Sequence, residues 1–291
     1  MKTILVPVDF SIPSENAARY ALHFGKILNS EIFLCNAYPV PAEAVGSAQI
    51  AWPLYDRTTL KAMNQEELEH LAKRLMNSEV FSNPDALHSS ISCATCPGET
   101  TEVIREFAIA NKAGMIIMGM SGAGAVTRFF MGSVVRETLD KVEYPLVLVP
   151  SEYAFRGINK IAFASDFNSS DIDVIQSLIP LASRFDAQLV IIHVTEEPED
   201  NAEYIKESAL FLKKVTNSID YDKVYCRHIY NLDTDSGLDW LTNQHDIDLL
   251  VMVHQRQGLL AEIFNDSHTK KLLTHINVPL LVFPSGKQFT F

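Results

Sequence analysis

Short apolar runs alternate along the chain with segments whose apolar residues recur three and four positions apart. The run 115–118 is bounded by glycine, as is typical of a strand buried in a parallel sheet. Other segments place their apolar residues on one side of a helix, as do Ala17, Ala21, Phe24 and Leu28. This alternation predicts an α/β fold in which helices cover both faces of a parallel sheet.

The whole pattern occurs twice. Three pairs of segments match: 4–11 with 161–168, 31–37 with 188–194, and 144–150 with 278–284. The shift is 157 residues (161 − 4) at the start of each half and 134 (278 − 144) at its end. The repeat predicts two tandem Rossmann-like domains, 1–150 and 151–291, each with a five-stranded parallel sheet.

The two halves are expected to differ in their helices. The first half is longer by 23 residues (157 − 134), most of which fall between 39 and 83. Residues 66–75 read there as an amphipathic helix, and its core-facing side carries Leu68, Leu71 and Leu75. In the second half, Pro180 falls inside the first helix, where it should kink or shorten that helix.

The last strand of each half, 146–149 or 280–283, is short and apolar. Strands of this kind at a sheet edge need cover. If they pair with each other about a pseudo-two-fold axis, one chain resembles a dimer of single-domain proteins.

A glycine-rich stretch after the run 115–118 suggests a phosphate site. It contains Gly119, Gly122 and Gly132, and Ser133 then opens a helix whose first-turn N–H groups and dipole attract phosphate without any lysine. Asp9, which ends the first strand, would flank the same crevice at the point where the strand order reverses. The alternative is that these glycines only permit tight packing of strand on helix.

Composition limits the classes of partner that the chain is expected to bind. A net charge of −12 argues against a nucleic-acid backbone or an anionic membrane as the main partner. Hydrophobic residues make up 47% of the chain and charged residues 21%, which is typical of a globular protein. No apolar run is long enough for a membrane span or a signal peptide, so we expect a cytoplasmic protein.

Four cysteines are too few for a disulfide framework and suit a reducing compartment. Cys93 and Cys96 form a CxxC pair. No second pair completes a zinc site, and the pair does not begin a helix as thioredoxin-type pairs do. We therefore favour chance spacing over a redox or metal role.

Three features occur together: the strand end 6–11, the loop 119–122 and, after nine further residues, the pair Gly132-Ser133. With these features the chain resembles the universal stress protein family in its tandem two-domain form. The resemblance covers the whole chain. The glycine motif G-x2-G-x9-G-[ST] is matched in the first half without a departure, and it is specific for the ATP-binding branch of the family. The resemblance therefore implies ATP, with or without magnesium, in the first domain, and it allows a homodimer.

The resemblance also implies roles for individual residues. Asp9 would bond the ribose, Pro7 and Val8 would line the adenine pocket, and the backbone of Ala37 would meet the adenine edge. Met118 would lie beneath the nucleotide. The amides expected to receive the phosphates are those of Gly119, Gly122, Gly132, Ser133 and Val134.

The second half departs from the motif. Under the shift of 134, Gly119, Gly122 and Gly132 become Val253, Arg256 and Asp266, and only Ser133 is kept, as Ser267. The larger side chains restrict the backbone, and a carboxylate at the helix start repels phosphate. We expect no triphosphate there. Asp166, which matches Asp9, has the alternative role of capping the next helix.

These features favour a stress-response protein that binds ATP and uses its occupancy to alter conformation or partner choice, rather than an enzyme. Slow hydrolysis or autophosphorylation at Ser133 or Thr127 stays open. The runner-up is a nucleotidyl transferase or ATP pyrophosphatase, but such enzymes usually carry a serine-glycine-glycine loop after the first strand, where this chain has 9–14. A third hypothesis is an interaction protein without nucleotide binding, which suits the second half better than the first.

Overall fold

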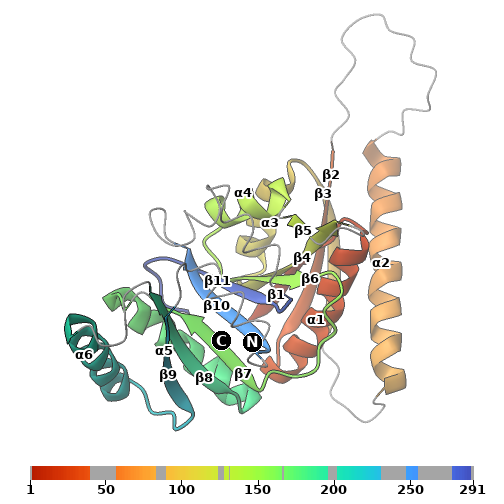
Figure 1. Ribbon diagram of the computed structural model, residues 1–291. Helices are drawn as coiled ribbons and strands as arrows, with labels where there is room; N and C mark the ends of the chain where they lie inside the picture. Colours follow the sequence, from red (N-terminus) through yellow and green to blue (C-terminus); the bar gives the residue numbers. More distant parts are fainter. Residues whose placement is uncertain are drawn as a thin grey trace, which may run out of the picture.

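A computed structural model describes residues 2–39, 57–82, 90–123, 128–130, 132–165, 167–195, 202–230, 247–254 and 277–289. Both halves of the chain contribute to one continuous sheet with helices on its faces (Figure 1). Among the helices of these residues, none is long and apolar enough to cross a membrane.

The first half follows the predicted alternation of strands and helices. Its elements are β1 (Thr3–Pro7), α1 (Ile12–Leu28), β2 (Glu31–Tyr38), α2 (Arg57–Ser82), β3 (Ile91–Pro97), α3 (Thr100–Ala110), β4 (Ala113–Ala123), β5 (Arg128–Phe130), α4 (Ser133–Lys141) and β6 (Leu146–Pro150). The predicted helix 66–75 is part of α2, and Leu68, Leu71 and Leu75 are buried as expected.

The second half repeats the order. Its described elements are β7 (Lys160–Ala164), α5 (Ser169–Phe185), β8 (Gln188–Thr195), α6 (Ala202–Ser218), β9 (Val224–Tyr230), β10 (Leu249–His254) and β11 (Leu280–Pro284). The segments 231–246 and 255–276, which match α3 and α4 by position, lie outside the described residues, as does Asp166. So do Arg256, Asp266 and Ser267, and Thr127 in the first half.

The strand order is β3-β2-β1-β4-β6-β11-β10-β7-β8-β9. Apart from β5, which pairs antiparallel with β4, the strands within each half are parallel, and the order reverses between the first and fourth strands of the half. In the first half the reversal falls between β1 and β4. This is the position at which the carboxyl ends of a parallel sheet open into a ligand crevice.

The two halves meet at β6 and β11, which pair antiparallel as the sequence predicted. Val147 lies opposite Leu281, its own counterpart in the repeat, and the neighbouring pairs are Leu148 with Leu280 and Leu146 with Val282. The register is therefore symmetric about a pseudo-two-fold axis through the central pair. Pairing gives each half a neighbour for a strand that would otherwise be an apolar edge.

Two cores lie on opposite faces of the sheet. Residues of α1, α2, α5 and α6 pack into one buried cluster, and those of α3 and α4 into the other. Figure 1 shows α2 standing outside α1 along the side of the first half. The cavity described below lies on the face of α3 and α4.

Backbone conformation follows the repeat. Phe10 and Phe167, separated by the shift of 157, both have a positive φ, of 61° and 59°. Asn29 and Asp186 end α1 and α5 in the same left-handed conformation. A bulky aromatic residue adopts this conformation at a cost of about 1–2 kcal/mol, so the turn after the first strand is held by its surroundings in both halves.

One expectation about local structure was wrong, and part of another was not met. Pro180 does not shorten α5, which has 17 residues, as α1 has. The stretch after Met118, expected to be a loop, continues as strand β4 to Ala123 and pairs with β5 in a hairpin. The aromatic residues Phe129 and Phe130 favour strand structure by propensity, and they pair with Gly122 and Ser121.

Side chains of α1 hold the connection between the halves. Asn16 Nδ2 donates to the carbonyl oxygens of Pro150 and Tyr153, at 3.0 and 2.9 Å. Tyr20 is fully buried and packs against the rings of Tyr153 and Phe155. α1 therefore contacts both its own sheet and the chain that leads into the second half.

We predict that Leu281→Ala lowers the free energy of unfolding by about 2–5 kcal/mol, because the side chain is fully buried at the axis between the halves. Urea denaturation should show one transition, shifted as a whole. The control is Leu210→Ala, whose side chain on α6 is 52% exposed and should change stability by less than about 0.5 kcal/mol. Two separate transitions, with only the second displaced, would contradict this prediction.

Candidate functional site

A cavity of about 350 Å³ opens at the carboxyl ends of β1, β2 and β4, where the strand order reverses. Its size is within the range of small-molecule sites. Strand ends, the turn after β1 and the first turns of three helices form the lining: Pro7, Val8, Asp9, Ser11, Pro13, Ser14, Cys35, Ala37, Thr100, Val103, Ile104, Met118, Gly119, Gly132, Ser133, Val134 and Val135.

Nine of the ten residues singled out in the sequence line this cavity. They come from four separated segments, which the parallel sheet brings to one edge. Gly122 is not among the lining residues that the structure describes. It lies on β4 opposite Phe129 in the hairpin.

Sequence reasoning missed the wall that α3 contributes. Thr100, Val103 and Ile104 are spaced three and four residues apart, so they share the side of the helix that faces the cavity. The same spacing is typical of any helix packed on a sheet. Only the strand order shows that this helix begins beside β1 and β4.

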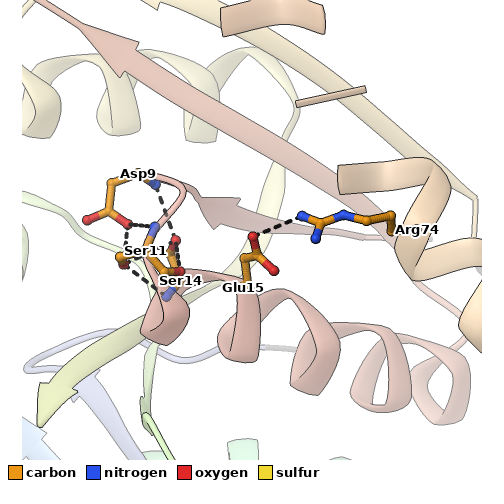
Figure 2. A network of polar contacts seen from close by, with 5 residues as sticks. All are labelled: Asp9, Ser11, Ser14, Glu15 and Arg74. Carbon is orange, nitrogen blue, oxygen red and sulfur yellow. Dashed lines mark hydrogen bonds and ion pairs between the residues drawn. The ribbon is translucent and has the colours of Figure 1, made fainter. Parts of the chain in front are cut away.

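A network of hydrogen bonds fixes Asp9 at the cavity edge (Figure 2). Its Oδ1 accepts hydrogen bonds from the backbone N–H and the hydroxyl of Ser11, and the hydroxyl of Ser14 donates to the carbonyl oxygen of Ser11. Ser11, rather than Asp9, is the residue that caps α1. Figure 2 shows the second carboxylate oxygen of Asp9 pointing away from these donors, where a ligand can reach it.

The carboxyl group of Asp9 is ionised at neutral pH. Partial burial raises its pKa, but hydrogen bonds from the Ser11 hydroxyl and the Ser11 N–H outweigh that effect, so its pKa lies below the ordinary value. An ionised carboxylate is an acceptor only, and it can receive hydrogen bonds from the hydroxyls of a sugar.

Gly119 permits a close contact between strand and helix. A Cβ at this position would lie 2.2 Å from the carbonyl oxygen of Pro13 and 2.8 Å from the backbone nitrogen of Ser14. No side chain fits at such distances, so the first turn of α1 can lie against β4 only because residue 119 is glycine. The packing role that the sequence offered as an alternative is thus present, in a residue that also lines the cavity.

Three helices begin at the cavity, and they differ in their caps. At α1, the Ser11 side chain accepts a hydrogen bond from Ser14 N at 3.4 Å. At α3, the Glu99 carboxylate accepts hydrogen bonds from Thr101 N and Glu102 N, both at 3.0 Å. Gly132 precedes α4, and no side chain of the described residues caps this helix. The first-turn N–H groups of α4 are therefore available to a ligand, while a carboxylate already occupies those of α3.

The second half carries different residues at matching positions. Ser14 corresponds to Asp171, whose buried carboxylate accepts a 2.6 Å hydrogen bond from Ser165 Oγ. At the position of Gly119 stands Val253, which packs against the hydrophobic core. A valine does not allow the approach that Gly119 gives α1.

Cys93 and Cys96 both lie on β3, within the strand rather than in a loop after it. Residues three apart in a strand point to opposite faces of the sheet, so the two thiols do not face each other. Both are free, and burial raises the pKa of the Cys93 thiol.

The universal stress protein family model matches residues 1–150 and again residues 157–284. The chain belongs to the universal stress protein family. It is 27% identical over 148 residues to a universal stress protein of Methanocaldococcus jannaschii, which covers 51% of this chain and 81% of the relative. A Thermus aquaticus member is 28% identical over 149 residues, covering 51% of this chain and 98% of that protein.

Solved structures share the tandem Rossmann-like fold. A universal stress protein from Archaeoglobus fulgidus aligns with a TM-score of 0.68 at 16% identity, over 97% of this chain and 98% of the other. One from Pseudomonas aeruginosa aligns with a TM-score of 0.66 at 13% identity, over 98% and 94%. Both cover nearly the whole of this universal stress protein, so its two halves share one arrangement with them.

Replacement of Gly119 by alanine should destabilise the protein by about 1–3 kcal/mol, because the new Cβ forces α1 away from β4. Gly132→Ala is the matched control, since nothing lies within 4 Å of a Cβ there and its φ is −59°. Chemical denaturation of both variants measures the difference. If the two variants have equal free energies of unfolding, α1 moves away from the new Cβ without loss of stability.

Asp9 should stabilise the fold at neutral pH but not in acid. Its pKa is lowered in the folded state, so its contribution is present above the unfolded value of about 3.9 and is lost as the pH falls through the folded value. The difference in unfolding free energy between wild type and Asp9→Asn should be constant from pH 8 to 5 and shrink toward pH 3. A difference that grows in acid would refute the assignment.

Proposed function

We propose that the first half of this universal stress protein binds ATP in the 350 Å³ cavity, in the cytoplasm, and that occupancy alters conformation or partner choice. The observation that carries this proposal is the difference between the ends of the cavity. One end offers uncapped helix N–H groups, and the other is apolar and closed to anions.

The phosphates belong at the start of α4. Arg136 N–H is bonded to the Gly132 carbonyl oxygen at 3.2 Å, and Ser133, Val134 and Val135, which precede it in the first turn, line the cavity. Their N–H groups and the positive end of the helix dipole attract an anion. The described lining contains no lysine or arginine, so these peptide groups supply the attraction.

The base belongs at the opposite end. The lining includes the apolar residues Pro7, Val8, Ala37, Val103 and Ile104, which suit a flat ring. The ionised Glu99 carboxylate caps α3 beside these residues, where it repels phosphate. The ionised Asp9 carboxylate, which lines the same cavity, supports a role in bonding the ribose hydroxyls.

The alternatives fit the cavity less well. A nucleotidyl transferase or ATP pyrophosphatase would hold phosphate on the loop after β1, but here the Ser11 side chain caps that helix and the Asp9 carboxylate lies beside it. We therefore expect binding without fast turnover. If the chain were an interaction protein that binds no nucleotide, the uncapped start of α4 in the first half would have no explanation.

Gly132→Asp should lower the affinity for ATP at least about tenfold, which is about 1.4 kcal/mol. The open space at this position accepts the side chain, but its carboxylate competes for the α4 N–H groups and repels the phosphates. Isothermal titration of ATP into each variant measures the affinity. Gly132→Ala is the control and should bind ATP as the wild type does, within about a factor of two.

Two results would overturn the proposal. One is a wild-type chain that binds no adenine nucleotide at millimolar concentration. The other is a Gly132→Asp variant that binds as tightly as Gly132→Ala, which would remove α4 from the phosphate site.

A further inference from the structure

An ion pair joins the first turn of α1 to α2. Arg74 Nη2 lies 2.9 Å from Glu15 Oε1, and the Glu15 side chain is 24% exposed while that of Arg74 is 65% exposed. Figure 2 shows Arg74 reaching from α2 toward Glu15, on the side of the turn away from Asp9. No other partner of the Glu15 carboxylate is present among the described residues.

Glu15 directly follows Ser14, which lines the cavity, in the first turn of a helix whose N-terminus faces the cavity. A carboxylate in this turn stabilises the helix but cancels part of the positive potential at its start. Arg74 neutralises that carboxylate from outside the cavity. Neither residue of the pair is among the described lining residues of the cavity.

The second half has no such pair. Ile172 stands at the position of Glu15 (15 + 157), and α6, which follows β8 as α2 follows β2, has 17 residues where α2 has 26. The first turn of α5 does carry a carboxylate, Asp171, but that group accepts a hydrogen bond from Ser165 Oγ. Among the described residues, an ion pair between this turn and the long helix is present only in the half with the cavity.

We propose that Arg74 is a positioning residue of the nucleotide site, which raises affinity for a polyanion by neutralising Glu15 at the start of α1. This inference rests on the proposed function, since it assumes that the phosphates lie in this cavity. An exposed ion pair contributes little to stability, so its effect should appear in binding rather than in folding.

The test is a double-mutant cycle with ATP titrated at 0.02 M and 0.5 M salt. Arg74→Gln leaves Glu15 unpaired and should weaken binding about threefold to tenfold at low salt. Glu15→Gln should bind at least as tightly as wild type, and the double variant should recover wild-type affinity. The Debye length falls from tens of ångströms to about 4 Å over this range, so the loss should disappear at high salt.

Lys223→Gln is the matched control, because it leaves Asp186 unpaired in the other half and should not change affinity. Thermal unfolding should be nearly unchanged in every variant. Equal affinity of Arg74→Gln and wild type at low salt would overturn the inference while leaving the proposed function intact. If both single variants lose the same amount of ATP affinity and the double variant does not recover it, the pair acts by holding α1 against α2 rather than by its charge. That result would also overturn the inference. If the wild type binds no ATP, the proposed function itself fails.

Discussion

The first turn of α1 lies so close to β4 that residue 119 has no room for a side chain, since a Cβ would be 2.2 Å from the Pro13 carbonyl oxygen. This contact fixes where α1 begins. It brings Ser11 to the carboxylate of Asp9 and sets Ser14 in the wall of the cavity. Further along, the same helix bonds the chain between the halves through Asn16, so the site and the junction share one rigid element.

The pseudo-two-fold axis relates two halves that have one architecture and different strand ends. The pairing of β6 with β11 requires only short apolar strands with a symmetric register about Val147 and Leu281. It places no demand on the carboxyl ends of β4 and β10. There the halves diverge, with Gly119 in one and Val253 in the other, so the symmetry of the scaffold coexists with a site described in only one half.

The sequence predicted much of this arrangement because its signals are local or repeated. The shift of 157 residues correctly paired α1 with α5, and the apolar run 146–149 correctly indicated a strand in need of a partner. The hairpin after Met118 was missed, because glycine and serine disfavour strands unless aromatic residues pair with them. The α3 wall depends on strand order, which no local pattern contains.

Charge decides how such a cavity can select its ligand. On a chain with a net charge of −12 and a described lining without lysine or arginine, peptide N–H groups are the only local attraction for phosphate in that lining. Two of the three helix starts are already capped by side-chain oxygens, and under the proposed function the phosphates would therefore lie at the start of α4. Each nearby carboxylate affects this attraction, and described groups hold each of them. Hydrogen bonds from Ser11 hold Asp9. The α3 N–H groups hold Glu99, and Arg74 holds Glu15, so neither charge faces the α4 end uncompensated.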